Sequence, residues 1–443
     1  MNRRGTRVLR LDALARVEGE AALHLHVRDG SVIATRLRIY EPPRFFEALL
    51  TGRGHAEPPD ITSRICGICP VAYQMSACRA IEDACGVTVD GPLADLRRLL
   101  YCGEWIESHA LHIHLLHAPD FFGLSDVVEL ARDHRAAVER GLRIKQTGNA
   151  IVEQLGGRPV HPVNVRIGGF YRTPAPEELR SLADRLRRAQ EDALETVRWV
   201  GAFEFPDAVC DHALFALRAP GRYAIDSGTP TVMDPVPREI PLSAFEEHVK
   251  EEQVPHSTAL TASLDGRRFL TGPLARYAIN GRWLHPVAAD AARDAGLGDP
   301  ATGAVCDNPF RSVVVRAVEI VHAVAEALRI IDGYERPHLP AVEVPPREGT
   351  GVGATEAPRG LLYHRYALTG EGTLTGARIV PPTAQNQTAI EEDVRRAVQA
   401  RLDRGGPPAD DDELTRLCER IVRNHDPCIS CAAHFLDVTL DRA

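Results

Sequence analysis

The sequence RICGICPVAYQMSAC at residues 64–78 contains one C-x-x-C pair, and HDPCISCAAH at residues 425–434 contains a second. Thiolates are soft ligands that favour nickel, zinc, copper(I) and the iron of iron–sulfur clusters. Structural zinc ribbons generally close a short loop, whereas these pairs lie more than 350 residues apart. The spacing therefore favours a functional metal site at the centre of the fold, formed by both ends of the chain. A structural zinc site and coincidental spacing are the alternatives.

Length and composition describe an ordinary globular protein, large enough for one big domain or for two to three smaller ones. The chain has 443 residues, of which 44% are hydrophobic and 26% are charged. Its net charge of -9 argues against a nucleic-acid partner, because no basic surplus is present to neutralise phosphates. No apolar stretch reaches the roughly 20 uncharged residues that span a bilayer, and the first residues lack the apolar core of a signal peptide. We therefore expect a cytoplasmic protein without a membrane span.

Ten cysteines are present, and disulfides are not expected in a cytoplasmic protein of this size. The cysteines outside the two C-x-x-C pairs are expected to be buried thiols that behave like small apolar side chains: Cys78, Cys85, Cys102, Cys210, Cys306 and Cys418.

Long segments with apolar residues at helical spacing predict helices over 93–117, 125–154, 176–200 and 309–332. Each helix has one apolar stripe, and a central bundle allows all of them to bury these stripes against one another. We expect the first helix to stop before Pro119 and the second to begin with Ser125 as its N-cap. Two further helices, at 389–404 and 413–423, are expected on either side of an exposed loop at 405–413.

Other segments indicate β structure. Residues 7–40 read as short strands, with alternating apolar positions on both sides of an Asp29-Gly30 turn. The predicted fold class is α+β and mainly helical, a central long-helix bundle with an N-terminal β region and peripheral α/β excursions. We expect a single domain over 1–443. Its N-terminal β region covers 1–60, its helical bundle covers 93–200 and 309–332, and its peripheral α/β excursion covers 203–305.

Both cysteine motifs resemble a known family. R-x-C-G-x-C and D-P-C-x-x-C-x-x-H are similar to the paired signatures of nickel–iron hydrogenase large subunits. Further segments resemble that family in its order: RVEGE (16–20), EPPRFFEALLTGR (41–53), HPVNVRIGG (161–169), EAPRGLLYH (356–364) and PPTAQNQ (381–387). The resemblance is greatest to the cytoplasmic, bidirectional, NAD(P)-linked subgroup that includes the sulfhydrogenases. It implies a catalytic subunit that splits dihydrogen reversibly and heterolytically into protons and electrons.

The resemblance implies a ligand for each metal of the centre. Nickel would be held by Cys66, Cys69, Cys428 and Cys431, with Cys66 and Cys428 as terminal ligands. Cys69 and Cys431 would bridge to an iron that also carries carbon monoxide and cyanide. Heterolytic splitting needs a base close to the metal, and the thiolate of Cys428 would be that base.

Three more positions match functional residues of the family. Glu18 matches its first proton-relay carboxylate, although a salt bridge with Arg16 at the surface is the simpler alternative. Arg359 matches the guanidinium that overhangs the open metal position, and its alternative role is to fix a loop by hydrogen bonds. Asp426 could pair with an arginine or hydrogen-bond the site, or its Asp-Pro sequence could only form a turn.

A second, hard metal is implied near the C-terminus, magnesium or iron in the family. Its ligands would be the Glu47 carboxylate, the Gln387 backbone carbonyl and the His434 imidazole; without the family, Glu47 reads as a solvated helix residue. Residues 435–443 would be a tail that a maturation endopeptidase removes after nickel insertion, or else a retained short extension.

Electrons must leave through other polypeptides. No strand-linked G-x-G-x-x-G is present, since GVGATEAPRG (351–360) lacks the strand–helix setting. No further clustered cysteines remain for iron–sulfur clusters. The resemblance supplies an iron–sulfur small subunit, and the subgroup adds a flavin- and NAD(P)-binding diaphorase. The alternatives are a non-catalytic relative similar to a respiratory-complex subunit, which lacks the four cysteines, and a structural zinc protein.

Some residues depart from the family pattern or invite a different interpretation. Tyr73 stands where many members have histidine, and Ser108 where many have aspartate, which puts in doubt any role transferred to these positions. Histidines cluster on one predicted helix, but helical histidines are more often core or interface residues, which is what we expect of His109, His112, His114 and His117.

Overall fold

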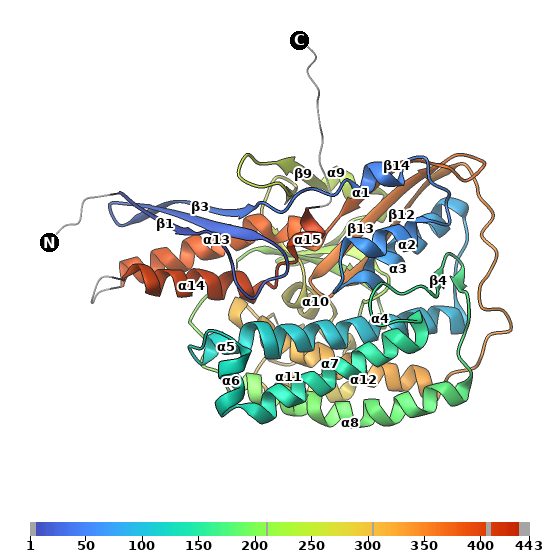
Figure 1. Ribbon diagram of the computed structural model, residues 1–443, viewed down its shortest axis with the longest axis horizontal. Helices are drawn as coiled ribbons and strands as arrows, with labels where there is room; N and C mark the ends of the chain where they lie inside the picture. Colours follow the sequence, from blue (N-terminus) through green and yellow to red (C-terminus); the bar gives the residue numbers. More distant parts are fainter. Residues whose placement is uncertain (1–5, 210, 304, 405–408, 434–443) are drawn as a thin grey trace, which may run out of the picture.

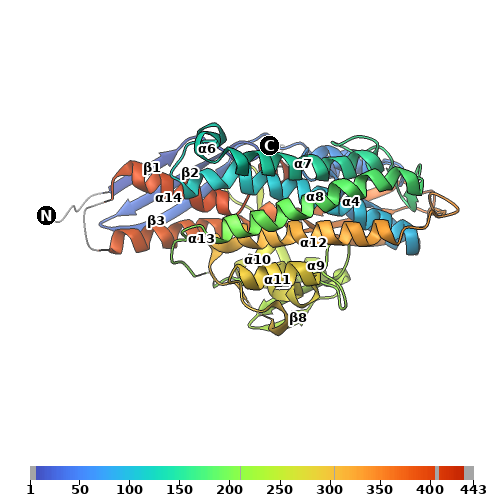
Figure 2. The ribbon, with the colours of Figure 1, turned by 90° about the horizontal axis from the view of Figure 1, so that it is seen from below.

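The computed structural model describes residues 6–209, 211–303, 305–404 and 409–433. A bundle of long helices occupies one side of the molecule, and the sheets lie on the other side together with α13 (Pro382–Asp403) and α14 (Asp411–Asn424), as Figure 1 shows. The bundle contains α4 (Gly91–Leu111), α7 (Arg135–Gly156), α8 (Pro176–Gly201) and α12 (Ser312–Asp332). Figure 2 shows these helices running side by side along the molecule. The predicted bundle is confirmed.

Two glycines bring α4 and α7 unusually close together. A Cβ atom on Gly148 of α7 would lie 2.6 Å from both the Gly103 carbonyl oxygen and the Glu107 backbone nitrogen of α4. A Cβ atom on Gly103 would lie 2.9 Å from the Ile151 side chain. Any side chain at these positions would therefore push the helices apart. Polar side chains next to the glycines consequently lie close together where α4 and α7 meet.

The helix boundaries around residues 112–135 differ from the prediction. After α4 the chain makes a π-helical segment (His112–His117) and then α5 (Ala118–Phe121). Pro119 therefore does not stop the helix, because it lies in the first turn of α5, where its missing N–H is not needed.

The following segment is also divided. The expected long helix is broken at His134 into α6 (Val127–Asp133) and α7. Its N-cap is Asp126, whose carboxylate accepts from the backbone nitrogens of Val128 and Glu129. The Ser125 backbone N–H instead donates to the Glu129 carboxylate. Asp126 is therefore the residue whose side chain accepts from the free N–H groups of the first turn.

The N-terminal sheet contains β1 (Thr6–Leu11), β2 (Ala21–Arg28) and β3 (Ser31–Ile39) in an antiparallel arrangement. The hairpin turn at Asp29 and Gly30 is confirmed, and both residues have positive φ as a tight turn requires. The sheet packs on α13 (Pro382–Asp403), and α13 packs on α14 (Asp411–Asn424). The β region ends at Ile39, however, since α1 (Phe46–Leu50) and α2 (Pro58–Thr62) follow it.

The helix α13 begins seven residues before the predicted start at Ala389. Pro382 supplies its first turn, where fixed φ and the missing N–H suit a helix. The segment PPTAQNQ therefore contains the start of this helix. The other helix of this region, α14, agrees with the prediction within two residues, and part of the loop expected at 405–413 lies outside the described residues.

A second sheet supports the segment that follows the first cysteine pair. It consists of β12 (Gly349–Ala357), β13 (Gly360–Leu368) and β14 (Leu374–Val380), and α3 (Pro70–Cys85) lies against β12. A Cβ atom on Gly351 would lie 2.2 Å from the Ala80 carbonyl oxygen, and one on Gly353 would lie 2.6 Å from that of Ser76. These glycines let α3 sit directly on the strand.

The region between residues 203 and 305 contains small sheets and short helices. One sheet has the strand order β11-β6-β7-β8, with β11 parallel to β6, and β9 pairs with β10. The bounds here are β6 (Ala213–Arg218), β7 (Thr229–Asp234), β8 (Val236–Glu239), α9 (Phe245–His248), β9 (Val249–Gln253), β10 (Leu260–Leu264), β11 (Phe269–Leu270), α10 (Pro273–Asn280) and α11 (Pro286–Asp294); elsewhere lie β4 (Val165–Arg166), β5 (Gly169–Phe170) and α15 (Ile429–Ala432).

The predicted fold class, α+β and mainly helical, is confirmed. Among the described residues, no helix combines the length and the apolar character that crossing a membrane requires.

Candidate metal centre

The two C-x-x-C pairs meet inside the molecule. Cys69 caps the N-terminus of α3, and Cys428 precedes the one-turn helix α15, which contains Cys431. The Sγ atoms of Cys66 and Cys428 lie 3.4 Å apart, as do those of Cys69 and Cys431, and the Sγ atoms of Cys428 and Cys431 lie 2.7 Å apart. All four are buried free thiols, and one ligand atom from each lies within 4.8 Å of the others.

This sulfur cluster has the dimensions of a metal site. Sulfurs bonded to one ion at about 2.3 Å cannot lie more than about 4.6 Å apart, which is close to the spread observed. Burial raises the pKa of Cys428 well above its ordinary value, while a hydrogen bond from the Cys428 thiol lowers the pKa of Cys66. Four thiolates packed this closely repel one another, so a bound cation is the group that would stabilise them together.

Arg44 joins the two cysteine segments. Its guanidinium donates to the Ile65 carbonyl oxygen at 2.6 Å and to that of Ser430, and its backbone nitrogen donates to the Ala433 carbonyl oxygen. Because Ile65 precedes Cys66 and Ser430 precedes Cys431, one side chain holds both halves of the cluster in register. Arg44 stands in the quoted segment EPPRFFEALLTGR, but nothing in its local pattern predicted this role.

The Glu18 carboxylate lies directly against the sulfur cluster. The Cys428 thiol donates to Glu18 Oε2 at 3.1 Å, and the Ser430 backbone nitrogen donates to the same oxygen at 3.0 Å. The backbone of Glu18 also pairs with the segment that begins at Cys428. Gly19 permits this approach, since its φ is 85° and a Cβ atom there would lie 2.6 Å from Ile429. The alternative in which Glu18 pairs with Arg16 is wrong, because Arg16 binds Asp120 instead.

Arg359 and Asp426 form a buried ion pair beside the cluster. Arg359 Nε donates to the Asp426 carbonyl oxygen at 3.0 Å, and its Nη2 donates to Asp426 Oδ1 at 3.1 Å. The other carboxylate oxygen accepts from Arg316 Nη1 at 3.3 Å. Burial opposes both charges, but Asp426 and the cysteines raise the pKa of Arg359 and the arginines lower the pKa of Asp426. Asp426 is therefore an arginine partner as well as a turn residue with φ of 52°.

Ser108 and Tyr73, the two residues that depart from the family pattern, also lie at this site. Ser108 accepts a hydrogen bond from Arg359 Nη1 at 3.3 Å, so it orients the guanidinium without adding a charge. Tyr73 is buried beside Cys431, and burial raises the pKa of its phenol well above the ordinary value. The phenol therefore keeps its proton and can donate a hydrogen bond.

Besides Arg44, the sequence reasoning missed two partners of this site. Thr383 Oγ1 accepts from the Cys428 backbone nitrogen at 2.9 Å, and Arg316 reaches Asp426 from α12. A signal for Thr383 was available, since it lies in the quoted segment PPTAQNQ. Arg316 gave one too, as a charged residue inside the most apolar helix of the chain, where burial needs a partner.

The second predicted metal site is described in part. The Glu47 carboxylate is buried and accepts from the Ile379 backbone nitrogen at 2.7 Å, and burial raises its pKa to about 7. Arg378 Nη1 lies 3.9 Å from the other carboxylate oxygen. Glu47 is thus not a solvated helix residue. Gln387 lies in α13 and donates from its side chain to the Leu37 carbonyl oxygen, while His434 lies outside the described residues.

The helical histidines have the surroundings of core residues. All four are buried, and burial lowers the pKa of His109 to about 4 and that of His114 to about 3. His114 stacks on Trp199, so it faces α8, whereas His112 lies against His117 with ring centroids 5.3 Å apart. The cysteines outside the pairs are also buried where described, and Cys210 lies outside the described residues.

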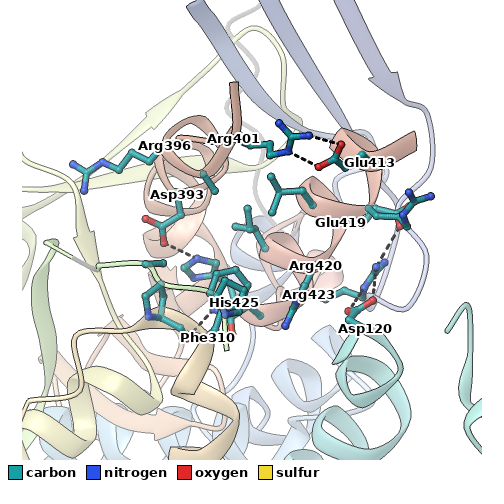
Figure 3. Close-up of a pocket in the computed structure, with 18 of the residues that line it drawn as sticks. Asp120, Phe310, Asp393, Arg396, Arg401, Glu413, Glu419, Arg420, Arg423 and His425 are labelled. Atoms are coloured by element: carbon teal, nitrogen blue, oxygen red, sulfur yellow. Dashed lines mark hydrogen bonds and ion pairs between the residues drawn. The ribbon is translucent and has the colours of Figure 1, made fainter. Parts of the chain in front are cut away.

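A large cavity lies away from the sulfur cluster. It has a volume of about 950 Å³. Residues of α13 and α14, the segment around Asp120, and the turn at Phe310 that precedes α12 line it. Figure 3 shows three pairs among its charged side chains: Arg401 with Glu413, Arg423 with Asp120, and Asp393 with His425. Arg420 lies over the rings of both Phe121 and Phe310. The polar lining is thus largely satisfied without a ligand.

Known proteins are similar to this chain in both sequence and fold. A family model described as nickel-dependent hydrogenase matches residues 44–146 and 313–434. The chain is 33% identical over 434 residues to the sulfhydrogenase 1 subunit alpha of Pyrococcus furiosus, covering 96% of this chain and 97% of that protein. It is also 33% identical to the sulfhydrogenase 2 subunit alpha of the same organism, covering 97% and 99%.

Solved structures have the same fold. An NAD+-reducing [NiFe]-hydrogenase in the H2-reduced state superimposes with a TM-score of 0.85 at 24% identity, covering 97% of this chain and 99% of that one. A [NiFeSe]-hydrogenase from Dm. baculatum superimposes with a TM-score of 0.77 at 23% identity, covering 97% and 100%.

Proposed function

The chain belongs to the nickel-dependent hydrogenase family, and we propose that Cys66, Cys69, Cys428 and Cys431 hold its nickel–iron centre. The chain is a catalytic hydrogenase subunit that interconverts dihydrogen with protons and electrons. One observation carries the assignment of the site: four buried thiols from both ends of the chain lie within 4.8 Å of one another. Cys69 and Cys431 are proposed to bridge the two metals, with carbon monoxide and cyanide completing the iron.

When bound, the nickel–iron centre supplies the redox-active site at which dihydrogen is split. The chain's own groups then handle the proton. The Cys428 sulfur accepts it and passes it to Glu18 Oε2, which lies 3.1 Å away. The Ser430 backbone N–H donates to the same oxygen at 3.0 Å and fixes its position. This geometry supports Glu18 as the first relay carboxylate, because a general base must lie within hydrogen-bond reach of the proton it takes.

Arg359 is proposed to place a fixed positive charge over the centre. Its three described hydrogen bonds to Asp426 and Ser108 hold the guanidinium in one orientation inside a buried site. A preorganised charge of this kind acts strongly where water is excluded. Asp426 keeps Arg359 oriented and, with Arg316 as its second partner, leaves no carboxylate oxygen of its own without a cation.

A second metal, magnesium or iron, is proposed for Glu47, the Gln387 carbonyl and His434. The support on the described residues is Glu47 alone, a buried carboxylate whose raised pKa would fall again beside a hard cation. We also propose that residues 435–443 are removed by a maturation endopeptidase.

Electron transfer is proposed to run through an iron–sulfur small subunit to a flavin- and NAD(P)-binding diaphorase in the cytoplasm. The support is the relatives' naming as alpha subunits of sulfhydrogenases, together with the absence of further described metal-binding clusters of cysteine, histidine and carboxylate side chains beyond the centre. We propose that the chain acts as a single large-subunit domain.

Elemental analysis of the purified chain, with whatever co-purifies, tests the metal assignment. Nickel with iron is the expected result. Zinc alone would instead support a structural site, and the absence of metal would support a non-catalytic relative.

The relay is tested by Glu18→Gln, which keeps the shape of the side chain and removes its ability to carry a proton. We expect nickel and iron content to be retained and the exchange of dihydrogen with deuterated water to fall about a hundredfold. Glu20→Gln is the matched control, since Glu20 is exposed two residues away. Full exchange activity in Glu18→Gln would contradict the relay assignment.

A further inference from the structure

A buried carboxylate on α4 faces the surface at one point. Glu107 is 8% exposed, and its Oε2 atom lies 3.1 Å from the Nζ atom of Lys145 on α7. Lys145 is partly exposed, with 27% of its side chain accessible. The chain has two lysines, Lys145 and Lys250, so this contact uses a residue type that is otherwise almost absent.

The close packing of α4 and α7 explains how the pair forms. Gly148 lies three residues after Lys145 and presses against the backbone nitrogen of Glu107, where a Cβ atom would come within 2.6 Å. Residues three apart on a helix share a face, so Lys145 and Gly148 meet the same stretch of α4. The lysine thereby reaches a carboxylate that neighbouring side chains shield from water.

The residue after Glu107 contacts the arginine beside the metal centre. Ser108, the next residue, accepts from Arg359 Nη1 at 3.3 Å, which brings α4 alongside the arginine above the cluster. One turn earlier, Glu104 accepts from the backbone nitrogens of Val71 and Ala72, just after Cys69. Glu104 is buried and has both oxygens occupied by the first turn of α3, so it holds the cysteine loop rather than reaching solvent.

The charged groups that act on Glu107 come from three separate segments of the chain. Burial raises the pKa of Glu107 to about 7; Lys145 and then Arg359 lower it, and Cys66 raises it. Glu107 in turn raises the pKa of Glu104, after the larger effect of burial. Glu107 therefore interacts electrostatically with two groups of the centre, Arg359 and Cys66, and with a partly exposed lysine.

From this geometry we infer that Glu107 carries protons between the metal centre and solvent along the α4–α7 contact, with Lys145 as its positioning residue. The inference rests on the proposed function and adds a route separate from Glu18. During dihydrogen oxidation the Glu107 carboxylate takes one proton from the centre side, directly or through water, and becomes a carboxylic acid. It returns to the carboxylate by releasing that proton to solvent water beside Lys145. Lys145 keeps its charge throughout.

The experiment uses the holoenzyme as it purifies and measures exchange between dihydrogen and deuterated water over a range of pH. In the Glu18→Gln background, adding Glu107→Gln is expected to lower the residual exchange about tenfold further. Nickel and iron content should match that of the Glu18→Gln enzyme. Equal exchange in the single and double variants would overturn the inference.

Lys145→Met, made in the same Glu18→Gln background so that the Glu18 route does not mask it, provides an independent test, because it leaves the Glu107 carboxylate in place. Glu107 must be ionised to accept a proton, so exchange rises with pH through its pKa. Removing the cation raises that pKa, and the rising limb of the pH profile should move about one pH unit upward. Lys250→Met in that background is the matched control, since Lys250 is exposed and donates to a backbone carbonyl, and its profile should equal that of the Glu18→Gln enzyme.

The outcomes separate this inference from the function it depends on. If the rising limb of the pH profile does not move in Lys145→Met, the route through Glu107 is overturned. This measurement remains decisive if Glu107→Gln fails to retain nickel. Absence of nickel and of exchange in the unsubstituted enzyme would instead reject the proposed function itself.

Discussion

Two buried clusters of charged and thiol groups lie near each other, and they differ in how their charges are balanced. In the first, four cysteine sulfurs meet at the centre, all of them potential anions. In the second, the Arg276 guanidinium donates to both oxygens of Glu319, at 2.7 and 2.8 Å, and to Glu356 at 3.2 Å. Tyr223 also donates to Glu319. The Arg276 cluster is internally paired, whereas the sulfur cluster needs a cation from outside.

The balance of charge distinguishes a structural charge network from a metal site. Burial alone does not distinguish them, since both clusters are inaccessible to water. A network that contains its own counter-ion is complete when the chain folds. A cluster of one sign is complete only with its ligand. The two are also linked, because Arg276 donates to the carbonyl oxygens of Ala357 and Pro358, immediately before Arg359.

The largest expected effect comes from breaking the sulfur cluster. Cys428→Ser removes a ligand sulfur and the proposed proton acceptor, so dihydrogen-dependent dye reduction should disappear and nickel content should fall. Metal analysis together with the dye assay measures both. Cys418→Ser is the control, because Cys418 is a buried thiol away from the cluster. Equal loss of dye reduction and nickel in both variants would mean that the effect is not specific to the sulfur cluster.

Breaking the Arg276 cluster should instead reduce stability. Arg276→Met removes the counter-ion of a fully buried carboxylate, which typically costs about 3–5 kcal/mol. Chemical denaturation would measure the free energy of unfolding. The folded protein should keep its nickel, since no ligand is touched. Loss of nickel without loss of stability would erase the proposed distinction between the clusters.

The pH dependence of stability sharpens the contrast within the Arg276 cluster. Burial raises the pKa of Glu356 to about 7 from an ordinary value of 4.5. A raised carboxyl pKa stabilises the folded state fully below about pH 4.5, and this contribution is lost as pH rises to about 7. The difference amounts to roughly 3 kcal/mol.

Glu356→Gln cannot titrate, so unfolding measured at several pH values should show a smaller decline between acid and neutral pH than in the parent protein. Parallel stability curves for the two proteins would show that Glu356 is ionised throughout that range.

The smallest of these effects is expected at Arg359, which belongs to neither cluster but is held between them. Arg359→Lys keeps the charge and loses the fork that binds Asp426. We expect nickel content to remain and turnover to fall about a hundredfold, or about 2.7 kcal/mol in transition-state stabilisation. Steady-state kinetics at saturating dihydrogen would measure it. Wild-type turnover would show that the charge suffices without its orientation.

Prediction from sequence succeeded where a local pattern carries the information. The long amphipathic helices, the Asp29-Gly30 hairpin and the C-x-x-C pairs are all short-range signals. It failed at boundaries where two local signals compete. Asp126 and Ser125 are both good N-caps, and the structure chose between them through the Glu129 carboxylate.

The amino-acid sequence sufficed to propose the four ligands, because soft thiolates at that spacing and the family's motifs do not depend on coordinates. The tertiary structure alone decided which groups surround them. Arg44, Thr383 and Arg316 come from three separate elements, and their contacts with the cysteine segments depend on long-range packing. Lys145 meets Glu107 because two glycines let α4 and α7 touch. Such meetings depend on the distance between helices, and no local sequence pattern encodes that distance.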